Sequence, residues 1–428
     1  MNKKADVVIV GTGVAGLFSA LNLPDDKEII MITKSDAESS DSFLAQGGIC
    51  VLRDEQDYDS YFEDTMRAGH YENRKESVDI MIRSSGKIIE DLVGYGVEFE
   101  KDGEAFAYTR EGAHSRPRIL FHADVTGKEI TSKLLARVRE KNNVTIYEYT
   151  TMTDILEENG KCAGITVKTK SGEESSIYAD YTILASGGIG GLYQHSTNFP
   201  HLTGDALEVA KKHHIRLEHL DYVQIHPTTL YSSKPGRRFL ISESVRGEGA
   251  LLYDKNGQRF TNELQPRDLL SQAIFEQMEK DGTDFVWEDM RPLGEKTIMQ
   301  HFPNIYQHCI EEGFDPRKEP IPVVPAQHYF MGGIQADLSG RTSMRGLYAC
   351  GETSCNGVHG KNRLASNSLL ESLVFARRAA DDMIFGEAPE MCRPDRLDLN
   401  QYEDQNVILE GYHKQVLNEI ERMKKANE

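Results

Sequence analysis

The chain opens with Asp6-Val7-Val8-Ile9-Val10-Gly11-Thr12-Gly13-Val14-Ala15-Gly16, and this stretch decides the fold. The apolar run at residues 6–10 predicts a buried strand, and the apolar spacing of residues 14–23 predicts a helix. Glycines between them allow a tight turn. A second apolar run, residues 28–32, predicts the next strand. Strand, helix and strand in this order indicate a parallel sheet, so we expect an α/β protein.

The glycine turn is typical of a dinucleotide site, because its backbone can approach a pyrophosphate and the following helix N-terminus favours the phosphate charge. The candidate cofactor residues here are Gly11, Thr12, Gly13, Val14, Ala15 and Gly16. An acidic residue after the second strand would bind the ribose of NAD, but Lys34 stands there. This disfavours NAD and leaves FAD open. A second close turn at Ser186-Gly187-Gly188 is in keeping with a flavoprotein.

Further along the chain, the periodicity predicts more helices and strands. Helices are expected at 76–93, 127–141 and 368–385, a loop at 42–48, and strands at 181–185 and 346–351. Four short segments, 144–148, 151–157, 164–169 and 175–179, are expected to form an antiparallel meander. Prolines punctuate residues 217–325 and indicate an inserted unit.

These patterns predict a discontinuous, Rossmann-like FAD-binding domain. We expect it to span residues 1–219 and 330–393, with an inserted α+β capping domain at 220–329. Residues 394–428 are polar and are expected to be a shortened helical tail.

The composition restricts the class of partner. A net charge of -19 argues against nucleic acid and anionic membranes, and no apolar run is long enough to span a bilayer. The N-terminus shows no signal-peptide pattern, and the six cysteines form no Cys-x-x-Cys pair. We therefore expect a cytoplasmic protein with free thiols and no metal site.

A polar segment late in the chain, residues 359–371, carries Arg363 just before a serine-rich helix start. Ser368-x-x-Glu371 has the spacing of a capping box, and such a helix start would stabilise an anionic reduced flavin. The alternative is an ordinary capped helix.

Several arginines and histidines could form one anion site, because arginine grips carboxylates in a bidentate way and histidine adds a tunable donor. The candidates are His226, Ser242, Glu243, Arg246, Arg267, His328 and Arg363. Each alone also has a plain explanation, such as a core histidine or a surface pair between Arg267 and Asp268.

Taken together, the chain resembles the fumarate reductase/succinate dehydrogenase flavoprotein superfamily, from Asp6 to about Ala380. Within it, the chain is most similar to the branch that oxidises L-aspartate. The matching segments are Ala45-Gln46-Gly47-Gly48, 109–120, 203–205, 226–228, 242–250, 266–268, 324–329, 332–333 and 351–371. One departure is that the sizeable helical domain that usually ends the family's chains is missing here or reduced to residues 394–428.

The resemblance implies a role for each matched residue. FAD would contact residues 12–15 and Lys34, Asp41, Ser42, Phe43, Leu44, Ala45, Gln46, Gly47, Gly48, Asp205, Glu352, Ser368 and Leu369. His226, Ser242, His328 and Arg363 would hold two carboxylates. Glu111, in the loop 110–116, would face a substrate amino group. Arg267 would carry a proton, with Glu243 and Arg246 as its relay. No histidine stands at 41–44, where covalent members carry one, so FAD is expected to be non-covalent.

The implied reaction is oxidation of L-aspartate to iminosuccinate, with hydride leaving the α carbon for flavin N5. Oxygen or fumarate would reoxidise the flavin, and iminosuccinate would pass to quinolinate synthesis and so to NAD. An arginine is a poor base, so Arg267 fits a proton donor in the fumarate direction better than the base for aspartate.

Other readings remain open. The nearest is a soluble fumarate reductase or succinate-oxidising flavoprotein. An electron-transfer subunit docked on an iron–sulfur partner, a flavin-binding module without catalysis and an NAD-dependent dehydrogenase are the others.

Overall fold

The computed structural model describes residues 3–234 and 236–386 and the single positions 414, 416, 418 and 420. Its largest sheet has the strand order β7-β2-β1-β10-β9-β8, with β17 also paired to β10. The strands are β1 (Lys3–Val10), β2 (Ile29–Ile32), β7 (Val144–Tyr147), β8 (Thr150–Glu158), β9 (Lys161–Thr169), β10 (Glu174–Leu184) and β17 (Leu347–Ala349). Strands β7, β2, β1, β10 and β17 are parallel. The predicted α/β class and the βαβ opening are confirmed.

Two predictions about this sheet are wrong. The segment predicted at 144–148 does not belong to the antiparallel meander, because β7 pairs in parallel with β2. The strands predicted at 175–179 and 181–185 are one strand, β10. Its first part pairs antiparallel with β9, and residues 177–184 pair in parallel with β1. One long strand therefore joins the two parts of the sheet.

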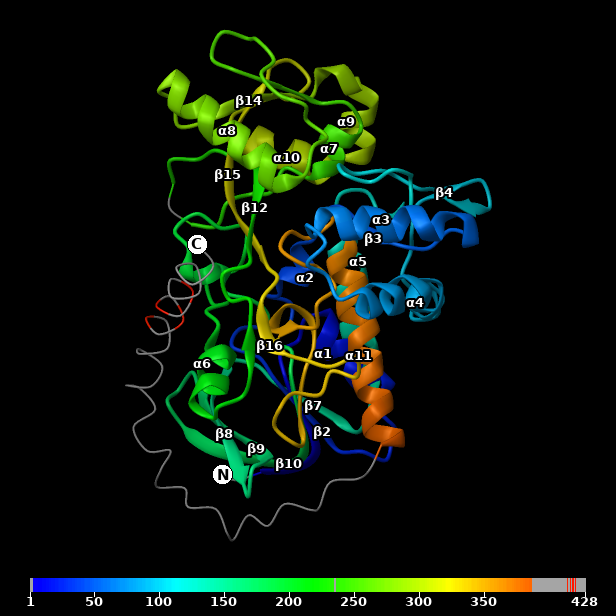
Figure 1. Ribbon diagram of the computed structural model, residues 1–428, viewed down its shortest axis with the longest axis vertical. Coiled ribbons are helices and arrows are strands. Elements are labelled where there is room, and N and C mark those ends of the chain that lie inside the picture. Colours follow the sequence, from blue (N-terminus) through cyan, green and yellow to red (C-terminus); the bar gives the residue numbers. More distant parts are fainter. Residues whose placement is uncertain are drawn as a thin grey trace.

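Helices cover both faces of this sheet (Figure 1). One face packs against α1 (Val14–Asn22), α4 (Lys75–Gly94), α5 (Thr126–Glu140) and α11 (Asn367–Phe385), which share one hydrophobic core. The opposite face packs against α6 (Asp205–Lys212). Val416 and Ile420, in the predicted tail, are buried in this second core. Lys414 and Asn418 are the other described positions of the predicted tail, and its remaining residues, like residues 387–393 with Cys392, lie outside the described part.

A separate layer, here called the cap region, consists of residues 223–330. Its antiparallel sheet has the order β12-β15-β14-β13, formed by β12 (Val223–Leu230), β13 (Leu251–Tyr253), β14 (Val286–Asp289) and β15 (Ile321–Phe330). Its helices are α7 (Glu243–Gly247), α8 (Arg267–Asp281), α9 (Glu295–His301) and α10 (Pro303–Glu311). The cap region has its own hydrophobic core, and the chain enters it through β12 and leaves it through β15 (Figure 1).

Shorter elements complete the described part of the chain. They are α2 (Asp41–Leu44), α3 (Tyr58–Ala68), β3 (Ile49–Cys50), β4 (Lys101–Asp102), β5 (Ala105–Phe106), β6 (Ile119–Leu120), β11 (Leu217–Glu218), β16 (Gly333–Gln335), β18 (Ser354–Cys355) and four 3-10 turns, at Glu55–Asp57, Gly190–Leu192, Arg291–Leu293 and Gly351–Thr353. The loop predicted at 42–48 is thus wrong in its first part, which is helical. The five cysteines in the described part are buried and free. Within this part, no helix is long and apolar enough to cross a membrane.

Candidate active site

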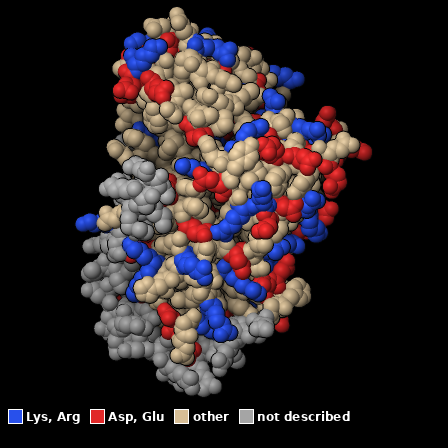
Figure 2. Space-filling model, in the orientation of Figure 1, with Lys and Arg blue, Asp and Glu red and all other residues tan. Residues whose placement is uncertain are grey.

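A cavity lies where the glycine turn, the start of α11 and the cap region meet. It encloses about 1650 Å³ of space, part of it open to solvent. Its lining runs from the glycine turn to residues of the cap region, so a dinucleotide and a small substrate could bind side by side in it. On the face shown in Figure 2, acidic and basic side chains are interspersed. On that face, the cations of the cavity therefore do not continue a basic surface.

The glycine turn forms one end of the cavity. Gly11 has φ of +116°, and a Cβ there would lie 2.1 Å from the Ala185 carbonyl oxygen. A Cβ at Gly16 would lie 2.2 Å from the Gly11 carbonyl oxygen. No side chain caps α1, whose first residue Val14 donates its N–H to Ser42 Oγ over 3.2 Å. The turn is therefore close-packed on one side, with a helix N-terminus of the kind that favours an anion.

Lys34 and Asp41 bring charge to the same end. Lys34 Nζ lies 2.5 Å from an Asp205 carboxylate oxygen and donates to Thr203 over 2.8 Å. Asp41 accepts the Phe199 N–H over 2.9 Å, and burial raises the pKa of Asp41 to about 7. Its other oxygen, Oδ2, is buried and finds no hydrogen-bond partner among the described residues. This oxygen is free to meet a ligand.

The start of α11 differs from the predicted capping box. The residue before the helix is Ser366, with φ of +60° and no side-chain cap, and Ser368 lies inside the helix. Ser368 instead accepts a hydrogen bond from Arg363, and Glu371 accepts one from Asn356. The capping-box prediction is wrong because both side chains are used for contacts across the fold. Ser368 and Leu369 still line the cavity.

Two arginines define the other end of the cavity. Arg267, the first residue of α8, pairs with Glu243 over 2.6 Å. Its other arm donates to Gln224 Oε1 over 2.9 Å, and Arg363 donates to the same oxygen over 3.3 Å. Burial would raise the pKa of Glu243, but the charges of Arg267 and Arg246 outweigh it and lower this pKa. Glu243 is therefore an anion held between two cations.

Arg363 lacks a carboxylate partner among the described residues. It donates to His328 Nε2 over 3.2 Å and its guanidinium lies 4.3 Å from the centre of the Tyr329 ring. Burial, then the charge of Arg267, lowers the pKa of Arg363 to about 10. It is thus a charged group, poorly compensated by the protein, that lines the cavity.

The two histidines beside these arginines are neutral. Burial and nearby arginines hold the pKa of both His226 and His328 well below the ordinary value. His226 Nδ1 lies 3.0 Å from the Thr228 carbonyl oxygen and 3.2 Å from the Thr228 amide nitrogen. The Nε2 of His226 is buried and unpartnered in the described part of the chain. It is a polar atom available to a ligand.

Glu111 places a carboxylate between the two ends. It is buried, and it accepts hydrogen bonds from Ser244 over 2.9 Å and from Ser366 over 2.5 Å. Burial and the charge of Glu243 raise the pKa of Glu111. Glycine at position 47 makes room for it, because a Cβ there would lie 2.3 Å from Glu111 Oε1.

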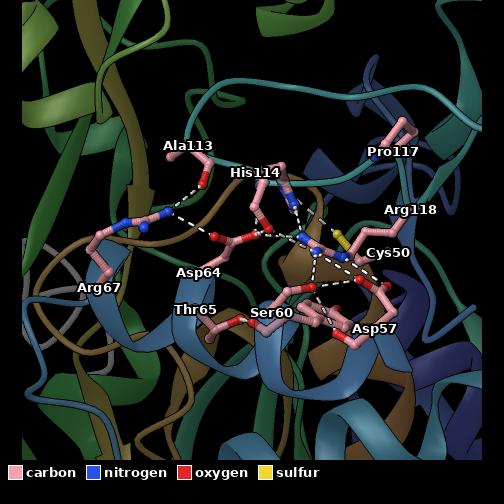
Figure 3. Close-up of polar contacts among 12 residues, drawn as sticks. Cys50, Asp57, Ser60, Asp64, Thr65, Arg67, Ala113, His114, Pro117 and Arg118 are labelled. Atoms are coloured by element: carbon pink, nitrogen blue, oxygen red, sulfur yellow. Dashed lines mark hydrogen bonds and ion pairs between the residues drawn. The ribbon is translucent and has the colours of Figure 1, made fainter. Parts of the chain in front are cut away.

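Behind the Glu111 loop, a buried ion cluster supports its shape (Figure 3). Arg118 is fully buried and donates to Asp57 over 2.9 and 3.1 Å and to Asp64 over 2.7 Å. It also donates to His114 Nδ1 over 2.9 Å, and His114 Nε2 lies 3.1 Å from the Ala365 carbonyl oxygen. The cluster thus ties the loop that carries Glu111 to the turn that carries Ser366.

Most predicted site residues line this one cavity. They are Gly11, Thr12, Gly13, Ala15, Lys34, Asp41, Ser42, Leu44, Ala45, Gln46, Gly47, Gly48, Gly187, Asp205, Glu352, Ser368 and Leu369 from the cofactor set, and Glu111, His226, Ser242, Glu243, Arg267, His328 and Arg363 from the substrate set. Val14, Gly16, Phe43 and Arg246 do not line it. Gly16 packs against the turn, and Arg246 is buried beside Glu243.

Several lining or bridging residues were not predicted. Gln224 joins the two arginines, and Ser244 and Ser366 hold Glu111. Arg237 lines the cavity from the cap region, close to Asp41. Gln224 had a signal, because it stands two residues before His226 in one strand and so shares its face. No pattern in the sequence around Ser366 indicated that its hydroxyl would contact Glu111.

Comparison with known proteins agrees with this geometry. Residues 6–369 match the model of the FAD binding domain family. An L-aspartate oxidase from Clostridium perfringens is 51% identical over 381 residues, covering 89% of this chain and 87% of the relative. A second, from Clostridium acetobutylicum, is 46% identical over 385 residues, 90% of this chain and 88% of the relative.

The chain belongs to the L-aspartate oxidase family. Among solved structures, a quinol-fumarate reductase with menaquinol molecules superposes with a TM-score of 0.83 at 33% identity. The match covers 89% of this chain and 71% of that one. The resemblance inferred from the sequence is therefore confirmed at the level of the family and of the fold.

Proposed function

We propose that this protein oxidises L-aspartate to iminosuccinate with a non-covalently bound FAD. The observation that carries the proposal is Glu111, a buried carboxylate that two hydroxyl donors hold at the arginine-rich end of the cavity. Dicarboxylates without an amine carry no ammonium group with which Glu111 could pair. The family supports the same activity.

The cavity has the features that FAD needs. The glycine turn forms a cradle that side chains would fill, and the orphaned Oδ2 of Asp41 is available to a polar group. The glycine turn, Lys34, the segment 41–48, Gly187, Asp205, Glu352, Ser368 and Leu369 would hold the cofactor. Bound FAD would supply the acceptor for a hydride from the substrate α carbon. Non-covalent binding is supported by the segment Asp41–Leu44, which contains no histidine.

The charges around the cavity suit aspartate. Arg246, Arg267 and Arg363 carry three positive charges, and Glu111 and Glu243 carry two negative ones, which leaves one positive charge uncompensated by these five groups. Aspartate carries two carboxylates and one ammonium, so its net charge of minus one balances the site. Arg363, His328, His226 and Ser242 would hold the carboxylates, and Glu111 would face the ammonium.

The proton steps fall to two residues. An ammonium cannot release a hydride from its carbon, so the amine must first lose a proton, and Glu111 is placed to take it. Its raised pKa makes it a better base than an ordinary carboxylate. Arg267, paired with Glu243, would donate a proton to carbon when fumarate is reduced.

A soluble fumarate reductase is the second candidate. The Arg267–Glu243 pair and the similarity to a quinol-fumarate reductase favour it. A fumarate reductase would consume reduced flavin and would need a separate reductant to regenerate it. Oxidation of L-aspartate would instead leave reduced flavin, which oxygen or fumarate would reoxidise. Iminosuccinate would then pass to the enzyme that forms quinolinate, the precursor of NAD, in the cytoplasm.

The decisive experiment is anaerobic reduction of the FAD-loaded protein. L-aspartate should bleach the visible absorption of the flavin, and succinate and D-aspartate should not. Later addition of fumarate or air would identify the acceptor. If L-aspartate fails to bleach the flavin but fumarate reoxidises chemically reduced protein, the fumarate reductase assignment replaces the proposal.

A further inference from the structure

Helix α10 in the cap region is capped by a residue from outside it. The helix begins at Pro303, and Phe302 before it offers no side-chain cap. Asp124 supplies the missing acceptors: its carboxylate accepts the Asn304 N–H over 3.2 Å and the Ile305 N–H over 2.6 Å. Asp124 stands 180 residues earlier in the chain and is 1% exposed. A carboxylate at a helix N-terminus satisfies free amides and favours the helix dipole.

The turn that carries Asp124 also touches the segment expected to hold the cofactor. Two residues later, Thr126 donates to the Gly47 carbonyl oxygen over 3.0 Å. Gly127 donates its N–H to the Ala45 carbonyl oxygen over 2.8 Å, and a Cβ at Gly127 would lie 2.1 Å from the Ser42 carbonyl oxygen. One rigid turn therefore connects α10 to the segment 41–48.

Other contacts cross the same boundary between the cap region and the rest of the molecule. The Ala113 N–H donates to the Leu264 carbonyl oxygen over 3.3 Å, and Ser244 donates to Glu111 over 2.9 Å. His70 and Asp268 form an ion pair over 2.9 Å, in which both side chains are at least one-third exposed. Asp124 differs from the residues of these other contacts, because it is a buried carboxylate that accepts hydrogen bonds from two backbone amides across the boundary.

We propose that Asp124 is a positioning residue, which holds the cap region against the segment 41–48 so that Arg267 and Glu243 reach the cavity. Its effect on catalysis rests on the proposed function, whereas its effect on the cap region does not. Loss of the carboxylate would release α10. The cap region would then open about β12 and β15, its two connections to the rest of the chain.

The test compares Asp124→Asn with Asp254→Asn in the FAD-loaded protein. Asp254 is the matched control, because it also accepts two backbone N–H groups, from Asn256 and Gln258, both over 2.8 Å, but wholly within the cap region. Hydrogen exchange is measured by mass spectrometry on peptides that contain Asn304, Ile305 and Ala113. The steady-state parameters for L-aspartate are measured in parallel.

In Asp124→Asn, the amides of Asn304, Ile305 and Ala113 should exchange roughly tenfold faster, and the KM for L-aspartate should rise more than kcat falls. Asp254→Asn should leave all three amides unchanged. The Ala113 amide distinguishes opening of the cap region from local fraying of α10. Asp124 does not contact Ala113, so its amide would be exposed only if the cap region separates from the rest of the molecule. Faster exchange at Asn304 and Ile305 without a change at Ala113 would overturn the proposal and leave Asp124 as a local helix cap.

If Asp124→Asn does not fold, Asp124→Glu, which keeps the charge but moves the carboxylate by one methylene group, gives the same comparison. If the wild-type protein fails to oxidise aspartate, the exchange data still decide the role of Asp124. The two proposals can therefore fail separately.

Discussion

Two buried arginines, Arg118 and Arg363, differ in how their charge is balanced. Arg118 has two internal carboxylates, Asp57 and Asp64, and it also donates to two hydroxyls and a ring nitrogen (Figure 3). Arg363 has a neutral amide, a hydroxyl and a neutral histidine, and no carboxylate partner in the described part of the chain. Burial of an unpaired charge is costly, so a protein that keeps one gains from a ligand that pairs it. Arg118 therefore stabilises the fold, whereas Arg363 is suited to bind an anionic ligand.

The largest effect should come from Arg363→Leu. The substrate carboxylate would lose its charged partner, so we expect kcat/KM for L-aspartate to fall roughly a thousandfold. This corresponds to a loss of about 4 kcal/mol in transition-state stabilisation. The Tm should stay the same or rise, because repulsion between Arg363 and Arg267 disappears. Steady-state assays and thermal unfolding measure the two quantities. Arg139→Leu, at an exposed position on α5, is the control. A Tm that falls with the activity would contradict the comparison.

The opposite pattern is expected for Arg118→Leu. Asp57 would stay buried without a cation and Asp64 would keep only its pair with the partly exposed Arg67, so the free energy of unfolding should fall by about 3–5 kcal/mol. Urea denaturation measures this loss. Adding Asp57→Asn and Asp64→Asn to the same chain should restore part of the stability, because the uncompensated charges are removed. If the triple variant is less stable than the single one, the cluster does not act through charge balance.

The sequence predicted the two ends of the cavity unequally. The glycine turn and its βαβ unit are local, so their spacing in the sequence was enough. The prolines of residues 217–325 indicated an inserted unit, but nothing in that segment predicted how the strands β12, β13, β14 and β15 pair. Glu111, Ser244 and Ser366 meet from segments up to 255 residues apart, and no periodicity reports such contacts. The capping-box prediction at Ser368 failed for a different reason: the helix begins at Asn367, and Arg363, only five residues away, donates to the hydroxyl that the pattern assigns to a cap.

Glu111→Gln separates the two candidate activities. Without the carboxylate, the ammonium of aspartate loses a charged acceptor, and kcat/KM for aspartate should fall by ~2–3 kcal/mol, about thirtyfold to a hundredfold. Fumarate reduction should be unchanged or faster, because a dianion no longer meets this negative charge. Both rates are measured on the same preparation, with chemically reduced flavin for fumarate. Equal losses in aspartate oxidation and in fumarate reduction would show that Glu111 does not recognise the substrate amine.

The pH profile gives a smaller effect in the same comparison. Burial and the charge of Glu243 raise the pKa of Glu111, so the carboxylate form is lost as pH falls through a value above the ordinary carboxyl range. The acidic limb of kcat/KM for aspartate should lie there, and it should be absent from Glu111→Gln. Profiles of wild type and variant across the acidic range test this. An acidic limb that survives in Glu111→Gln belongs to another group.

Ser366→Ala should give the smallest change, and it tests how the Ser366 hydroxyl shifts the pKa of Glu111. The Ser366 hydroxyl donates to the charged form of Glu111 and thereby lowers its pKa, against the larger effect of burial. Without the hydroxyl, the pKa should rise further and the acidic limb should move to higher pH, while the plateau rate falls by ~1 kcal/mol or less. Ser354→Ala is the control, because that buried serine donates to the Gly351 carbonyl oxygen instead. An acidic limb that moves to lower pH would mean that Ser366 accepts from a protonated Glu111. The resting carboxyl would then be neutral, and the charge balance that favours aspartate over fumarate would be reversed.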